Sequence, residues 1–88
     1  MQFRQKSGID AAPMEDQTVL FNPESKKFFV LNETAAFLWQ LLESAQTVDQ
    51  LAAALIEAFE GLGADVAKQD VDATLAELAE LDLVARTA

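Results

Sequence analysis

Apolar residues follow two periods along this chain, first the alternation typical of strands and then the spacing typical of helices. Residues 11–14, 18–21 and 27–31 are short runs of apolar, β-branched or aromatic side chains, which favour strands. Between the last two runs, Asn22 and Pro23 are the residues that a type I turn prefers at its first two positions. The pattern therefore predicts an antiparallel hairpin preceded by a weaker first strand.

The strand predicted over residues 27–31 is apolar on both faces. Alternation places Lys27, Phe29 and Leu31 on one side and Phe28 and Val30 on the other. A sheet with only one covered face would show polar residues at every second position. We therefore expect something to cover part of the second face or the edge of this strand.

Three helices are expected after the strands. Asn32 is a favourable N-cap for the first, and Thr47 with Gln50 forms a capping box for the second. The third is expected over about residues 70–81. The positions expected to face inward are Ala35, Leu38, Trp39 and Leu42 in the first helix, Val48, Leu51, Ala52, Leu55, Ile56 and Phe59 in the second, and Val71, Leu75 and Leu78 in the third.

The third helix has a second face beside its core face. Two such faces exceed what a single contact with the core requires. Gly61 is expected to end the second helix and Asp82 the third, with residues 62–65 as a short loop between the two helices. The second face consists of Thr74, Glu77, Leu78 and Leu81.

Length and composition predict one domain with a modest core. The chain has 88 residues, of which 51% are hydrophobic. We expect residues 1–10 to be loose and residues 11–85 to form the domain. The sequence contains no apolar run of about 18 residues, and its N-terminus lacks the apolar segment of a secretory signal. A cytoplasmic location without membrane contact is the resulting expectation.

Missing residue types restrict the chemistry. The sequence has no His, Cys or Tyr. Thiolate and imidazole metal sites, and nucleophiles activated by His, are therefore excluded. No pair of carboxylates is set apart for acid and base roles. We expect no catalytic residue, no metal and no cofactor.

Negative charge is concentrated in the helical part of the chain. Residues 1–31 hold four acids and four bases, whereas residues 32–85 hold eleven acids and only Lys68 as a base. Such a surface repels nucleic acid and anionic lipid. The acids either form a solvated face that keeps the protein soluble or attract a basic partner.

Three stretches of the sequence resemble a known family, and the likeness covers about residues 11–84. Residues 31–35 (LNETA) with Trp39 after them, then residues 47–55 (TVDQLAAAL) and 70–84 (DVDATLAELAELDLV), resemble pyrroloquinoline-quinone synthesis protein D. More broadly, the chain is similar to the precursor-peptide recognition elements of pathways that modify ribosomally made peptides. The chain departs from the family where Ala35 and Asp82 replace residues that are often Gly.

The resemblance implies an α+β fold that is winged-helix-like, with a three-stranded antiparallel sheet followed by three helices. It also implies a non-catalytic protein that binds the leader of a precursor peptide by strand addition along the third strand, against the third helix. The leader would then be presented to a modifying enzyme, such as a radical S-adenosylmethionine enzyme, a cyclase or a protease. The implied peptide-binding residues are Lys27, Phe28, Phe29, Val30, Leu31, Thr74, Glu77, Leu78 and Leu81.

Other interpretations remain open for several of these residues. Phe29, Leu31 and Trp39 are also read as core residues, and Lys26 and Lys27 either guard the edge or attract acidic leader residues. The same edge would also serve a homodimer. A DNA-binding winged helix is disfavoured because the third helix lacks the bases that it would need.

Overall fold

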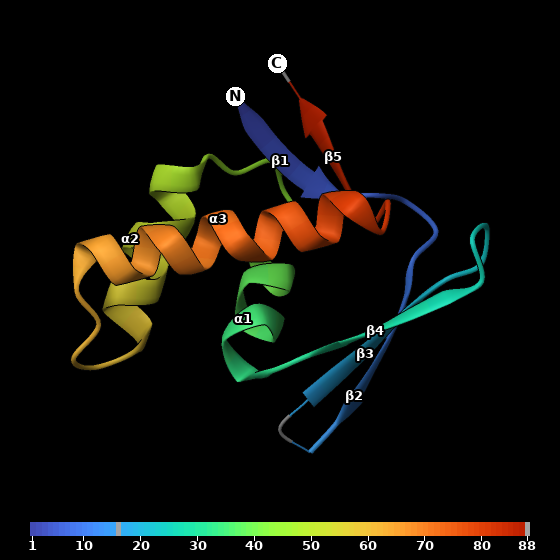
Figure 1. Cartoon of the computed structure of the whole chain (residues 1–88), viewed down its shortest axis with the longest axis horizontal. Helices are drawn as coiled ribbons and strands as arrows, with labels where there is room; N and C mark the ends of the chain where they lie inside the picture. Colours follow the sequence, from blue (N-terminus) through green and yellow to red (C-terminus); the bar gives the residue numbers. More distant parts are fainter. Residues whose placement is uncertain (16, 88) are drawn as a thin grey trace.

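The computed structural model describes residues 1–15 and 17–87, which form two antiparallel sheets and three helices (Figure 1). The larger sheet has the strand order β2-β3-β4, and its strands come before the helices in the chain. The expected α+β class, a three-stranded antiparallel sheet followed by three helices, is therefore confirmed. The strands of this sheet are β2 (Asp10–Met14), β3 (Gln17–Asn22) and β4 (Lys27–Leu31), and the helices are α1 (Glu33–Leu41), α2 (Val48–Ala58) and α3 (Ala64–Glu80).

A second, two-stranded sheet joins the two ends of the chain. β1 (Gln2–Gln5) pairs antiparallel with β5 (Val84–Thr87). The backbone of Phe3 also exchanges hydrogen bonds of 2.7 and 2.9 Å with Gln46. The expectation of a loose segment over residues 1–10 is thus wrong for residues 2–5. These residues become a strand because a partner from the far end of the chain satisfies their backbone groups.

The hairpin of β3 and β4 is confirmed, with Thr18 opposite Leu31 and Asn22 opposite Lys27. The Lys26 N–H donates to the Asn22 carbonyl at 2.7 Å, and the Glu24 N–H donates to the Asn22 side chain at 3.0 Å. This closed turn spans one residue more than the four of a type I turn. Lys26 adopts a φ of 60° at its end.

Both expected helix N-caps are present. The side-chain oxygen of Asn32 accepts from the Ala35 N–H at 2.9 Å, so α1 begins directly after β4 without a linker. In α2 the Gln50 N–H donates to the Thr47 hydroxyl at 3.1 Å, and the Thr47 N–H donates to the Gln50 side chain at 2.8 Å. This reciprocal pair is the predicted capping box.

Replacing Thr47 with Ala is expected to lower the free energy of unfolding by about 1 kcal/mol, because the Gln50 N–H loses its acceptor. Urea denaturation followed by circular dichroism measures this change. Thr47→Ser keeps the hydroxyl and serves as the control that should remain near the parent protein. Equal urea midpoints for the Ala variant and the parent would contradict a stabilising role for the cap.

α3 is longer than predicted. It begins at Ala64 directly after Gly63, so the expected start near residue 70 and the expected loop at residues 64–65 are wrong. The added turns are held by Ala67, which is fully buried one turn before Val71. At the other end Asp82 ends the helix with a φ of 60°, and the Leu83 N–H donates to the Leu78 carbonyl at 2.8 Å. This left-handed C-terminal turn confirms Asp82 as the stop.

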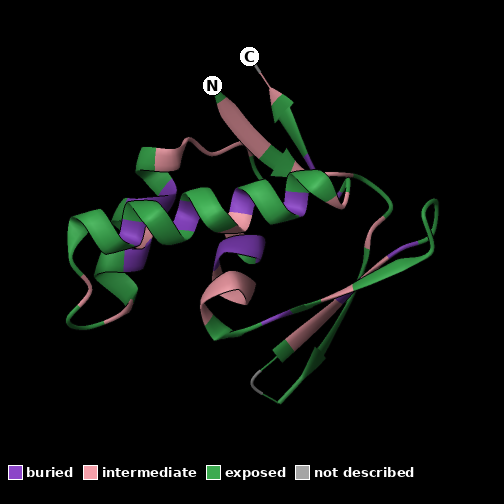
Figure 2. Cartoon of the chain, viewed as in Figure 1, coloured by how far each residue is buried: buried purple, intermediate pink, exposed green. Residues whose placement is uncertain are grey.

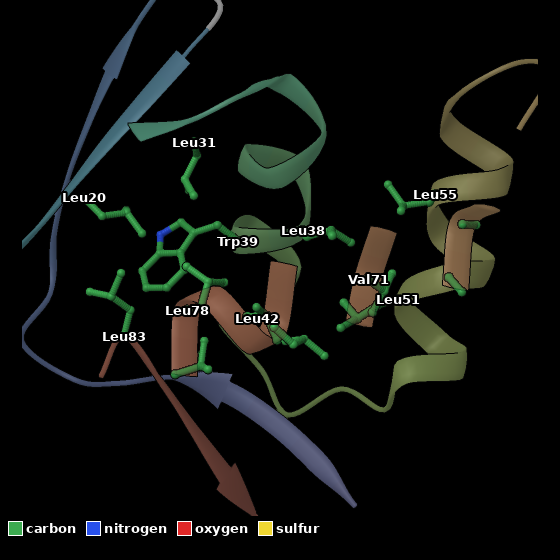
Figure 3. Close-up of a cluster of buried hydrophobic side chains, with 14 residues drawn as sticks. Leu20, Leu31, Leu38, Trp39, Leu42, Leu51, Leu55, Val71, Leu78 and Leu83 are labelled. Atoms are coloured by element: carbon green, nitrogen blue, oxygen red, sulfur yellow. The ribbon is translucent and has the colours of Figure 1, made fainter. Parts of the chain in front are cut away.

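The hydrophobic core lies where α1 packs between the β2-β3-β4 sheet and the other two helices. Buried positions line the side of α3 that faces α1 (Figure 2). Leucines from the strands and helices surround Trp39, which is 5% exposed (Figure 3). The prediction for Ile56 is wrong, because 41% of this residue is exposed. The largest fully buried side chains are Leu20, Leu31, Leu38, Leu42, Leu51, Leu55, Leu78, Leu83 and Val71.

Candidate functional site

β4 is an open edge of its sheet. One side of β4 pairs with β3, and no strand pairs with its other side within residues 1–15 and 17–87. In an antiparallel sheet every second residue of such an edge directs its N–H and C=O away from the neighbouring strand. β4 therefore offers unsatisfied backbone donors and acceptors to a further strand.

A hollow of about 250 Å³ lies between this edge and α3. β4 forms one wall and the middle of α3 forms the other, while the beginning of α1 closes the end. We call this hollow the β4–α3 groove. It is lined by Phe29, Val30, Asn32, Thr34, Ala35, Asp70, Ala73, Thr74 and Glu77.

The groove brings together four of the nine residues predicted for the site, namely Phe29, Val30, Thr74 and Glu77. Two others are core residues, since Leu31 is 1% exposed and Leu78 is not exposed at all. The side chains of Leu31 and Leu78 are therefore taken up by the core. The remaining three, Lys27, Phe28 and Leu81, lie outside the lining of the groove.

Asp70 and Ala73 line the groove but were not among the residues predicted for it. Asp70 precedes Thr74 by four residues, and Ala73 precedes Glu77 by four, so both share the face of α3 that the sequence had singled out. Both residues fall within the helix expected over about residues 70–81, so counting the positions one turn before Thr74 and Glu77 as part of this face would have found them.

The other face of β4 remains uncovered. Phe28 is 68% exposed and Val30 is 52% exposed, and the ring of Phe28 rests on Phe21 with centroids 4.6 Å apart. The cover expected from the apolar alternation is not supplied by any element within the described ranges. Outward-pointing side chains of an added strand would lie beside Phe28 and Val30 as cross-strand neighbours.

Polar contacts fix the hairpin relative to the end of α3. Asn22 is 2% exposed, and its side-chain N–H donates to the Asp82 carbonyl at 3.2 Å. The Lys6 amine binds the Asp82 carboxylate, and its Nζ lies 4.0 Å from Oε2 of Glu24. The hydrogen bond with Asp82 raises the pKa of the Lys6 amine above its usual value. These contacts tie the turn end of the hairpin to the residue that follows the end of α3.

Residues 1–15 and 17–87 contain no group of three acidic, His or Cys side chains placed to hold a metal ion. The helices in this described part are also too short or too polar to cross a lipid bilayer. The groove therefore presents backbone groups, apolar side chains and carboxylates to a ligand. Such a surface recognises a ligand by shape, hydrogen bonds and charge.

An open edge strand facing a helix across a groove, on a small α+β domain, is the arrangement of domains that bind an extended peptide by strand addition. The chain belongs to the family of coenzyme PQQ synthesis protein D, whose family model matches residues 17–84. No curated protein matches the chain. The family prediction made from residues 31–39 and the two later helices is confirmed.

Solved structures agree with this assignment. Lasso peptide synthetase B1 complexed with its leader peptide is similar at a TM-score of 0.82 and 26% identity, covering 98% of this chain and 100% of that chain. TbiB1 in complex with the TbiA(beta) leader peptide has a TM-score of 0.84 and 20% identity over 97% and 98% of the two chains.

A third similar structure is the PqqD part of Methylobacterium extorquens PqqCD. It is a stand-alone recognition element for ribosomally synthesised and post-translationally modified peptides. Its TM-score is 0.78 at 24% identity, covering 97% of this chain and 89% of that chain. At this identity the likeness supports the fold.

Proposed function

We propose that this protein is a non-catalytic peptide-binding module that captures the leader of a ribosomally made precursor peptide. The observation that carries the proposal is the open edge of β4 facing α3 across a groove. Similar structures that hold leader peptides support it. The captured precursor is then presented to a separate modifying enzyme, such as a radical S-adenosylmethionine enzyme, a cyclase or a protease.

Strand addition explains how such a groove would bind a peptide. Backbone hydrogen bonds to β4 supply affinity that is independent of sequence, and alternate side chains supply specificity. Side chains on one face of the added strand enter the groove beside Phe29 and Ala73, and those on the other face lie beside the exposed Phe28. Of the predicted site residues, these contacts use the backbone of β4 (Lys27–Leu31) and the side chains of Thr74 and Glu77.

The strand-to-helix junction prepares this edge for binding. The Asn32 cap starts α1 directly after Leu31, and Asn22 ties the opposite end of the hairpin to Asp82. An edge that is already ordered loses less conformational entropy on binding than a flexible one. The abrupt junction thus favours capture of an extended peptide.

Titration with the leader peptide encoded beside this gene is expected to shift the backbone amide resonances of residues 27–31 and of α3. These are the walls of the groove, whereas the amides of α2 lie away from it and serve as the internal control. Heteronuclear NMR on the ¹⁵N-labelled chain is the measurement. Saturating peptide that moves neither wall would refute the proposal.

The same edge would serve an alternative function, pairing with a second copy of the chain. Exposed Phe28 and Val30 on an unpaired strand favour such self-association. Sedimentation velocity with and without leader peptide separates the two functions. A tight dimer that the leader cannot dissociate would support a structural module. A dimer that the leader dissociates would mean that self-association and leader binding both use β4.

A further inference from the structure

The wall of the groove that faces β4 is acidic. Asp70 and Glu77 both line it, seven residues apart and therefore on the same side of α3. Thr74 and the small Ala73 lie between them, so neither carboxylate is screened from the groove by a bulky neighbour. Any strand added to β4 would run past two negative charges.

The base on α3 does not neutralise this wall. Lys68 lines a different hollow, together with Phe3, Val48 and Asp72. The ion pairs that form within residues 1–15 and 17–87 involve Lys6 with Asp82 and Glu24, and neither Asp70 nor Glu77 takes part in them. Both carboxylates are thus available to a ligand.

We infer that the peptide in the β4–α3 groove carries a Lys or Arg side chain directed at Asp70 and Glu77, beside small or apolar residues that fill the space over Ala35 and Ala73. This inference rests on the proposed peptide-binding function and specifies the chemistry of the leader. A basic side chain gains charge-assisted hydrogen bonds there, whereas an acidic one is repelled. The two carboxylates thus select among peptides that β4 alone would bind without distinction.

The spacing of the bases along the added strand follows from the distance between Asp70 and Glu77 along α3. Two helical turns separate Asp70 from Glu77, a rise of about 10 Å. A strand covers this length in about three residues. The expected motif therefore contains one base, or two bases spaced two or four residues apart, so that both side chains face inward.

Selection of a display library of random 12-residue peptides on three forms of the protein tests the inference. The forms are the parent, Asp70→Asn with Glu77→Gln, and the control Asp72→Asn with Glu57→Gln. Both double variants remove two carboxylates, but Asp72 lies on the hollow that contains Lys68, and Glu57 lies on α2 outside the groove. Nonspecific attraction between basic peptides and an acidic protein should weaken equally in both double variants. A loss of affinity seen only with Asp70→Asn, Glu77→Gln therefore reports on the groove.

Peptides selected on the parent are expected to be enriched in Lys or Arg and to shift the amides of residues 27–31. Their affinity should fall about 3- to 10-fold on the Asp70→Asn, Glu77→Gln variant, as for partly exposed charge pairs, and stay unchanged on the control. Replacing the peptide's base with Gln should cause the same loss on the parent and no further loss on that variant.

Two outcomes separate the inference from the function on which it rests. Peptides that shift the amides of residues 27–31, lack enrichment in bases and bind all three forms equally would overturn the inference and leave the peptide-binding function standing. Failure of both the library and the leader to shift those amides would overturn the peptide-binding function and, with it, the inference.

Discussion

Filling the groove by replacing Ala73 with Trp is expected to weaken leader binding by about 30-fold or more, the loss typical of a blocked hot spot. Ala73 lines the hollow between β4 and α3 and is exposed to solvent. An indole at this position occupies the space that inward-facing side chains of the added strand need. The strand can then no longer approach β4 closely enough to form its backbone hydrogen bonds.

The matched control is Ala79→Trp. Ala79 is also an exposed alanine of α3, but six residues further along it lies on the side of the helix turned away from the groove. Both variants should unfold at similar urea concentrations, since neither indole enters the core. Isothermal titration with the leader peptide gives the affinities. Equal binding by the two variants would place the peptide elsewhere than in the groove.

Replacing Trp39 with Ala is expected to lower the free energy of unfolding by about 3–5 kcal/mol, a large part of the 5–15 kcal/mol typical of a folded domain. The indole is 5% exposed and lies among Leu20, Leu31, Leu78 and Leu83, so it joins the hairpin to α3 (Figure 3). Its loss leaves a cavity that these leucines cannot fill without moving the sheet. Circular dichroism in urea measures the effect without relying on Trp fluorescence.

Phe28→Ala is the contrasting aromatic truncation. Phe28 is 68% exposed and touches Phe21, so its removal should change stability by about 1 kcal/mol or less while weakening leader binding. The two aromatics would then divide their roles, with Trp39 holding the core and Phe28 meeting the partner. A Trp39→Ala variant that kept its stability but lost the leader would instead identify Trp39 as a stacking residue.

Local features were predicted well because short-range interactions determine them. The Asn32 cap, the Thr47 and Gln50 capping box, and the hairpin closed at Asn22 each depend on residues within a few positions of one another. The left-handed turn at Asp82 likewise follows from a residue that tolerates that conformation. In each case the backbone finds its hydrogen-bond partner nearby in the sequence.

Other features could not be read from local sequence. β1 becomes a strand only because β5 lies beside it, and nothing in residues 2–5 indicates a partner at residues 84–87. Ile56 follows the helical spacing of its neighbours yet is 41% exposed, since no element of the described chain packs over it. Periodicity indicates which face of a helix is apolar, but packing decides how much of that face is buried.

The sequence by itself determined the class of the domain, the apolar edge strand and the two-faced third helix, since alternation, capping and helical spacing act over a few residues. Only the tertiary structure decided how these parts meet. It buried Leu78 in the core, set Asp70, Ala73 and Glu77 opposite β4, and left Phe28 and Val30 exposed. The physical reason is that a groove is formed between elements distant in the chain, so its lining depends on how those elements pack.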